Sequence, residues 1–271
     1  MAGGSLVEQL AGHVKDSNEF HFPWGNVGIP ACLTNLGITK YVVIELGVAA
    51  LMLLIFIPLA VRVRGGQPAK GRLWNMFEFI LVFLKDQVIV PAIGTAKDAA
   101  PYIPYLWTLF FFILFCNLAG MIPWMGSPTG ALTITLTLAL CTLVIVMATG
   151  ILRHGPIGFW RGMAPPIDGK VLSAVLTPVL LVLEIFSFFV KHCTLCIRLM
   201  ANMFGGHLML AVFLAFIPMT AWSLYVWLPV TFLSVGASVA ISFLELLVAA
   251  LQAYIFTFLT SLYIGMAIHQ H

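Results

Sequence analysis

The sequence has very little charge for its length. Only 8% of its 271 residues are charged, whereas 61% are hydrophobic and the mean hydropathy is +1.06. A soluble globule has to cover itself with charged and polar side chains, so this composition excludes a soluble enzyme. The formal net charge of +3 is too small to indicate a nucleic-acid partner. The chain is instead expected to lie in membrane lipid.

The signatures of several other protein classes are missing. Residues 1–30 have no apolar core of a signal peptide, and they hold too few basic residues for a transit peptide. Gly66 and Gly71 have the spacing of a phosphate-binding loop, but Arg72 stands where that loop needs lysine. No H-E-x-x-H motif occurs, and the C-x-x-C of Cys193 and Cys196 has no second pair. No cofactor or metal is therefore expected.

Long apolar runs dominate what is present. A helix needs about 20 apolar residues to span a membrane, and the runs lack the alternation of an outer-membrane barrel. Residues 73–90 are interrupted by Glu78, Lys85 and Asp86, which favours an amphipathic helix there. We therefore predict an all-α polytopic membrane protein with that amphipathic helix and five transmembrane helices. The predicted spans are 41–61, 104–122, 131–151, 171–217 and 230–268.

The last two runs are longer than one upright span requires. At about 1.5 Å per residue, 171–217 would extend about 70 Å and 230–268 about 58 Å, against a hydrocarbon core of about 30 Å. The first run forms either one tilted helix or two spans joined by a tight hairpin, and the sequence alone leaves both open. Two consecutive long runs favour a tilted antiparallel pair, which we predict.

Basic residues gather in alternate loops. Nine of the thirteen Lys and Arg residues lie in 62–98 and 153–170, whereas 124–130 and 218–229 contain none. The positive-inside rule then predicts a cytoplasmic C-terminus and an N-terminus outside, as five spans require. Residues 41–268 are expected to form a single membrane domain after an outer N-terminal segment of residues 1–40.

A few ionisable side chains remain inside the apolar runs. They are Glu45, Glu184, Lys191, His192, Arg198, His207 and Glu245. An arginine at mid-membrane costs about 2.5–3.5 kcal/mol even on a lenient scale, so Arg198 is expected to serve an ion path. Glu184 lies on the same helical side as Arg198, about 21 Å toward the inside. Asn202 lies on that side too, one turn after Arg198.

Spacing also relates the two long runs. Glu245, Gln252 and Tyr263 share one side of the last run, because seven and eleven residues separate them. If Gln252 lies level with Arg198 in an antiparallel pair, Glu245 and His207 reach similar depths. An acid and an imidazole would then meet on the outer side, with a lone acid on the inner side. Arg198, whose guanidinium cannot lose its proton, would lie between the outer and inner polar groups. A rotary ion motor needs a fixed positive charge at such a position.

Two other functions were compared with this one. A membrane metalloenzyme would use His192, His207 and Glu245, but their spacings are not those of a metal site. A secondary transporter would show an internal repeat with broken helices near mid-membrane, and no convincing repeat is present.

Three segments resemble subunit a of F-type ATP synthases. Residues 197–207, IRLMANMFGGH, resemble the family signature R-L-x-x-N-x-x-x-G-[HE]. Residues 245–263 and 115–123 carry two further matches, and Pro128-Thr129 also fits. The resemblance covers roughly residues 40–268. One departure is 188–193, where the sequence has Lys-His and the family usually has Arg-Pro.

The resemblance implies a role for each matched position. Arg198 would be the arginine that faces the carboxylates of a rotating c-ring. The outer half-channel would contain His207, Glu245, Asn202 and Gln252, and the inner one Glu184 and Tyr263. The chain would then be the stationary proton-translocating subunit of the F0 sector, not catalytic alone. Its partners would be the c-ring, the subunit b stalk, lipid and, indirectly, the F1 sector, in a bacterial inner membrane.

Overall fold

The described chain is almost entirely helical. A computed structural model describes residues 19–22, 25–28, 39–63, 71–122, 126–162 and 170–269. Most of the predicted segment 1–40 lies outside the described residues, and so do 64–70 and 163–169 of the basic loops. The elements are β1 Glu19–Phe22, β2 Gly25–Gly28, α3 Lys40–Val63, α4 Arg72–Phe83, the π-helical η1 Leu84–Ile89, α5 Val90–Ile93, α6 Ala96–Ala99, α7 Ile103–Gly120, the 3₁₀ turn η2 Pro128–Gly130, α8 Leu132–Gly162, α9 Lys170–Met219 and α10 Leu224–Ile268.

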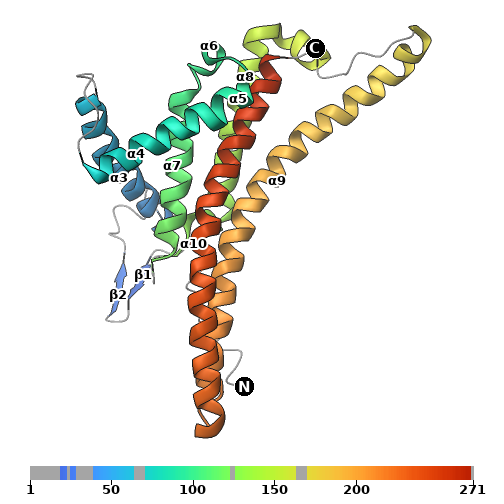
Figure 1. Cartoon of the computed structure of the whole chain (residues 1–271). Coiled ribbons are helices and arrows are strands. Elements are labelled where there is room, and N and C mark those ends of the chain that lie inside the picture. Colours follow the sequence, from blue (N-terminus) through green and yellow to red (C-terminus); the bar gives the residue numbers. More distant parts are fainter. Residues whose placement is uncertain are drawn as a thin grey trace. The chain divides into compact units, whose positions relative to one another are not determined.

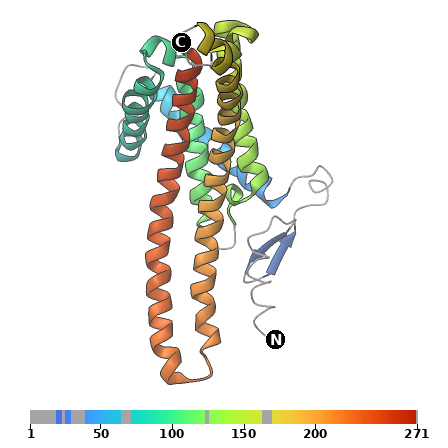
Figure 2. The ribbon, with the colours of Figure 1, turned by 90° about the vertical axis from the view of Figure 1, so that its right-hand side faces the viewer.

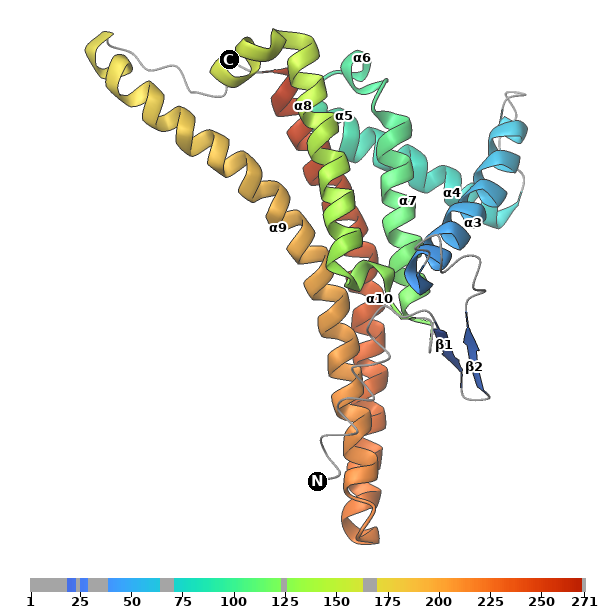
Figure 3. The same cartoon turned by 180° about the vertical axis from the view of Figure 1, so that it is seen from behind.

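Among the described residues, five helices are long and apolar enough to cross a membrane: α3, α7, α8, α9 and α10. This confirms the predicted all-α polytopic fold with five spanning helices. The sequence analysis did not anticipate β1 and β2, which pair antiparallel with Glu19 opposite Gly28 (Figure 3). Each strand has four residues, which is too short for an alternating pattern to be recognised.

The helices α9 and α10 are each continuous, with 50 and 45 residues. The structure therefore selects one long helix for the fourth run, not two spans with a hairpin. The α10 helix begins at Leu224, before Pro229, whereas the prediction started it after that proline. Pro229 lies close to the start of α10, where its missing N–H removes one backbone bond and the helix can still pass through it.

The third spanning helix also differs from its prediction. Residues 153–162 are helical and not part of a loop, because α8 continues to Gly162 across a kink. Gly155 has a φ of 75° inside α8, a conformation that favours glycine. Pro156 follows, and its fixed φ suits the first position of a new helical stretch.

An amphipathic helix was predicted over 73–90, and a helical run occupies Arg72–Ile93 as α4, η1 and α5. No residue of α4 is fully buried, and several of its apolar side chains, such as Phe79, are exposed. Trp107 Nε1 of α7 donates to the Leu81 carbonyl at 3.1 Å. This bond ties the amphipathic helix to a spanning helix.

The chain forms two compact units, each assembled from three stretches. Unit 1 contains the chain to Ile55, Phe111–Thr135 and Arg198–Ala253. Unit 2 contains Phe56–Phe110, Leu136–Ile197 and the chain from Tyr254. In unit 1, the end of α9 and the start of α10 run side by side as an antiparallel pair (Figure 1, Figure 2).

Close backbone packing joins α10 to α5 inside unit 2. A Cβ on Gly265 of α10 would collide with the Ala92 carbonyl of α5. Only glycine permits this approach, and it brings the last turns of α10 against the end of the amphipathic run.

Candidate functional site

An acid and an imidazole face each other across unit 1. Nδ1 of His207 on α9 lies 3.7 Å from Oε1 of Glu245 on α10. The Glu245 side chain is only 3% exposed and that of His207 18%. Within the described part of the chain, Glu245 Oε1 and His207 Nε2 have no hydrogen-bond partner. The pair can therefore pass a proton between its members, directly or through one water.

A second polar pair joins the same two helices. Asn202 Nδ2 donates to Gln252 Oε1 at 2.8 Å. Gln252 is buried, and its Nε2 has no partner among the residues that the structure describes. The antiparallel arrangement considered from the sequence has Gln252 level with Arg198, and in the structure Gln252 bonds to Asn202, one turn further along α9.

Arg198 belongs to the same unit and is half-buried. Over the described ranges, no ion pair or hydrogen bond engages its guanidinium. A guanidinium carries five N–H donors and stays protonated in proteins. The described residues therefore leave the N–H donors of Arg198 available to an anionic group.

A buried network around Asn117 supports the turn of α10 that carries Glu245. Asn117 Nδ2 donates to the Ala249 carbonyl at 3.2 Å, and Thr129 Oγ1 donates to Asn117 Oδ1 at 2.7 Å. The Ser127 hydroxyl lies 3.1 Å from that of Thr129. The sequence analysis quoted both segments but assigned these side chains no role. An asparagine inside an apolar helix was the signal that could have identified them.

A cavity of about 380 Å³ also lies in unit 1. Ser238 and Ser242 of α10 line it among mostly apolar side chains. Their spacing of four residues, and three more to Glu245, sets all three on one side of α10. The Ser242 hydroxyl donates to the Ser238 carbonyl at 2.9 Å. This cavity offers hydroxyl groups for water one turn (Ser242) and about two turns (Ser238) from the buried acid.

The residues predicted for the inner side meet at a different cavity, in unit 2. Glu184 and Lys191 of α9 and Tyr263 of α10 line a space of about 260 Å³. Phe159 and Phe188 contribute its apolar wall. The two predicted inner residues, Glu184 and Tyr263, therefore lie on one cavity that also contains an unassigned lysine.

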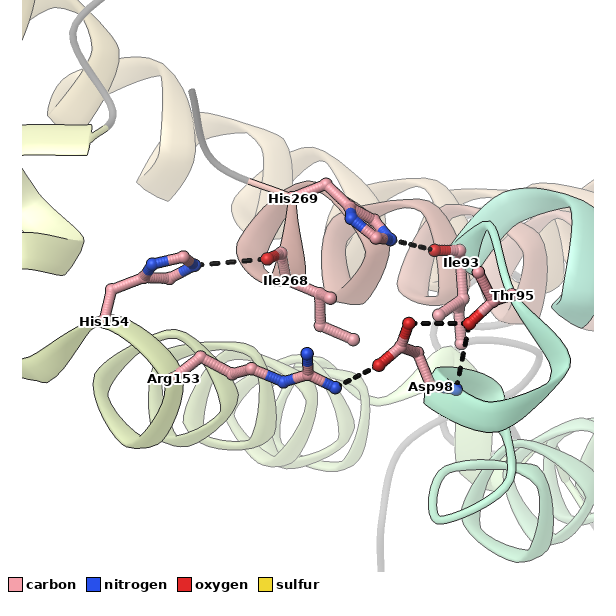
Figure 4. Close-up of polar contacts among 7 residues, drawn as sticks. All are labelled: Ile93, Thr95, Asp98, Arg153, His154, Ile268 and His269. Atoms are coloured by element: carbon pink, nitrogen blue, oxygen red, sulfur yellow. Dashed lines mark hydrogen bonds and ion pairs between the residues drawn. The ribbon is translucent and has the colours of Figure 1, made fainter.

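Two histidines hold the C-terminal end of α10 within unit 2 (Figure 4). His154 Nε2 lies 3.1 Å from the Ile268 carbonyl, and His269 Nε2 lies 2.9 Å from the Ile93 carbonyl. Both carbonyls end helices, where the backbone has no intrahelical donor, so each imidazole N–H can donate to one. These contacts fix the part of α10 that carries Tyr263, and the sequence analysis did not find them.

Asp98 forms a neighbouring polar cluster (Figure 4). The Thr95 hydroxyl donates to Asp98 Oδ2 at 2.6 Å and accepts from the Asp98 backbone N–H at 3.2 Å, which caps α6. Arg153 of α8 forms an ion pair with Oδ1. The Thr95 hydroxyl first, and then the Arg153 guanidinium, hold the pKa of the Asp98 carboxyl below its ordinary value.

This lowered pKa predicts an acid-dependent stability difference. A depressed carboxyl pKa stabilises the folded state above the ordinary value near 4, and the stabilisation is lost as the pH falls through the folded value. We expect Asp98→Asn to lower the melting temperature of the detergent-purified chain slightly at neutral pH, because the pair is solvent-exposed. The difference from wild type should diminish as the pH falls through the lowered pKa of the folded-state Asp98 carboxyl. Asp86→Asn is the matched control. Among the salt bridges of the described residues, Asp86 takes part only in the one with the adjacent Lys85, at 3.7 Å. A pH-independent difference would contradict the assignment.

Comparison with known proteins identifies what this chain resembles. A family model described as ATP synthase A chain matches residues 42–265. Proteins named ATP synthase subunit a are similar along most of their length. The protein from Myxococcus xanthus is 36% identical over 244 residues, covering 89% of this chain and 76% of the relative. The protein from Rhodobacter capsulatus is 40% identical over 202 residues, covering 73% and 80%. That from Hyphomonas neptunium is 36% identical over 206 residues, covering 76% and 78%.

Proposed function

This chain belongs to the ATP synthase A chain family, and on that premise we propose how it moves protons in the F0 sector. It is the stationary subunit that offers two offset half-channels to a rotating c-ring. Arg198 separates the half-channels, so that a proton can cross only by travelling on the ring. Ion flow is thereby coupled to ATP synthesis, and the chain is not catalytic by itself.

One observation carries the proposal: in one unit, α9 carries an arginine that no described residue pairs with, and α9 and α10 together form a buried acid–imidazole pair. A ring carboxylate that approaches Arg198 is favoured in its ionised form and releases its proton. The carboxylate has to be neutral before it can enter lipid, because burying a bare charge is prohibitive. Arg198 attracts the carboxylate without carrying protons itself, since a guanidinium does not titrate.

The outer half-channel uses the polar pairs of unit 1. Protons reach Glu245 and His207 from water at the cavity that contains Ser238 and Ser242. Imidazole and a carboxylate can exchange a proton near neutral pH. Asn202 and Gln252, which are bonded to each other, hold the polar groups next to Arg198 along α9.

The inner half-channel uses the cavity of unit 2. Glu184 is the acid of this path, and Tyr263 is a polar residue on its wall. The path opens to the cytoplasm, because the basic loops place the inner side there. The N-terminus is then outside and the C-terminus cytoplasmic, in a bacterial inner membrane. Subunit b supplies the peripheral stalk, and the F1 sector acts indirectly.

Gly206 offers a test of the outer pair. A Cβ on Gly206 would come 2.8 Å from Glu245 Oε1, whereas a Cβ on Gly205 would meet nothing within 4 Å. We expect Gly206→Ala to displace the carboxylate from His207 and to lower ATP-driven pumping by roughly tenfold, a small share of what proton transfer can contribute. Gly205→Ala is the matched control and should pump normally. Equal pumping by the two variants, at equal assembly, would argue against the position of Glu245.

Cross-linking tests which partner lies opposite Arg198. Ile197, the preceding residue, is 55% exposed on α9, and a photoactivatable benzophenone amino acid can replace it in the assembled complex. We expect its cross-linked product to contain subunit c. The same replacement at Leu54, which is 72% exposed on α3, should give no such product. A product with another subunit at Ile197, and none with subunit c, would overturn the proposed arrangement.

A further inference from the structure

His192 is a buried imidazole in unit 2 that the half-channel model leaves unused. Its exposure is 4%. Its Nδ1 lies 2.9 Å from the Phe188 carbonyl one turn earlier, so Nδ1–H donates to that oxygen. The neutral ring then presents a lone pair at Nε2. Nε2 is buried and, within the described residues, has no hydrogen-bond partner.

The ring of His192 lies against the wall of the inner cavity. Its centroid is 5.1 Å from that of Tyr263 and 4.8 Å from that of Phe188, and both partners line the cavity. The charged and titratable groups that line this cavity are Tyr263 from α10, Lys191 and Glu184 from α9, and His269, which follows α10. Along α9, His192 follows Glu184 by eight residues and precedes Arg198 by six.

A purely structural role accounts poorly for this side chain. A phenylalanine would make the same ring contacts without burying an unpartnered nitrogen, which costs stability. A metal site is not supported either, because no three His, Cys, Asp or Glu residues in the described ranges could hold an ion together. A basic nitrogen beside a cavity that an acid, a lysine and a tyrosine line is instead what proton transfer requires.

We propose that His192 is a proton relay of the inner half-channel, a role that rests on the function proposed above. Nε2 accepts a proton that the Glu184 carboxyl releases through water of its cavity, which leaves a Glu184 carboxylate and an imidazolium. The same Nε2–H bond then breaks as the proton passes, through water on the Arg198 side, to an ionised ring carboxylate. The Nδ1–H bond to the Phe188 carbonyl persists throughout, so the ring returns to its starting tautomer. Transfer in the opposite direction uses the same bonds in reverse order.

Substitutions at this one position separate relay from packing. His192→Phe keeps an aromatic ring and removes the basic nitrogen. In inverted vesicles that contain the whole complex, we expect it to lower ATP-driven pumping by at least about tenfold. Passive proton conductance after removal of the F1 sector should fall similarly. Wild-type pumping and conductance in this variant would overturn the relay.

Chemical rescue gives the decisive readout. It remains informative for a variant that assembles poorly, because the same assembled complexes are compared with and without the added compound. His192→Ala leaves room beside the cavity, and added imidazole should restore conductance several-fold in assembled complexes. Pyrazole has nearly the same shape but is far less basic, and it should restore none. Equal rescue by both compounds, or rescue by neither, would show that His192 only fills space.

The relay and the half-channel model fail differently. Normal pumping by Arg198→Ala would reject the half-channels regardless of His192. Normal pumping by His192→Phe, with none by Arg198→Ala, would reject the relay and leave the half-channels standing.

Discussion

Replacing Arg198 with alanine is expected to abolish ATP-driven proton pumping in inverted vesicles, while ATP hydrolysis by the F1 sector remains. Without the guanidinium, no fixed positive charge favours the ionised form of a ring carboxylate at this position. Neutral carboxylates would then pass between the half-channels without releasing their protons, and rotation would no longer be coupled to transport. Pumping is measured by quenching of a pH-sensitive dye, and hydrolysis by phosphate release in the same preparation.

The control has to remove the same charge elsewhere. Arg62→Ala serves this purpose, because Arg62 stacks on the Trp74 ring at 4.7 Å near the end of α3 and has no part in either polar pair. It should pump normally. Arg198→Lys tests whether any positive charge is enough or whether the charge has to be permanent. A buried lysine can lose its proton, so we expect pumping well below wild type. Normal pumping by Arg198→Ala would remove the basis for the separated half-channels.

The five spanning helices could be predicted from the sequence because lipid imposes a simple requirement. Each span needs a long apolar run with its backbone bonds satisfied internally, and few other patterns in this chain meet that condition. Their ends were less predictable. The predicted last span starts after Pro229, which lies inside α10, and Gly155 belongs to the predicted loop 153–170 but forms a kink inside α8. Both depend on local backbone conformation, which composition does not reveal.

The polar pairs of unit 1 were predictable in part. Helical periodicity grouped Glu245 with Gln252 on one side of α10, and an antiparallel partner then had to bring them against α9. The axial position of α10 relative to α9 could not be predicted, because shifting one helix along the other by one turn leaves the same sides in contact. Gln252 consequently bonds to Asn202, one turn from the expected level of Arg198.

Contacts distant in sequence escaped prediction altogether. The Asn117–Ala249 bond joins residues 132 positions apart, and the His269–Ile93 contact joins residues 176 apart. No periodicity within one helix relates such positions. Asn117 could be recognised as a polar residue in an apolar run. His154 lies beside the kink of α8 and His269 just after α10, and both resemble ordinary interfacial residues in the sequence.

Exchanging His207 and Glu245 should be milder than removing either one. The exchange keeps one acid and one imidazole at a site where their atoms lie 3.7 Å apart. Either His207→Ala or Glu245→Ala leaves a single buried group without its proton-transfer partner, and we expect each to lower pumping by about a hundredfold. The double exchange should therefore retain pumping, but at an intermediate level. Space beside Gly206 is tight, since a Cβ there would lie 2.8 Å from Glu245 Oε1, and an imidazole at this place is bulkier than the native carboxylate.

A double-removal variant completes this comparison. If the two side chains act as one relay, removing both should cost little more than removing one, since the first removal already disables the pair. Independent roles would instead multiply the two losses. The exchange and the double removal thus examine coupling from opposite directions: one preserves the chemistry and inverts its order, and the other deletes it. Equal loss of pumping in the exchange and in both single variants, together with multiplied loss in the double, would show that His207 and Glu245 are near each other without passing a proton between them.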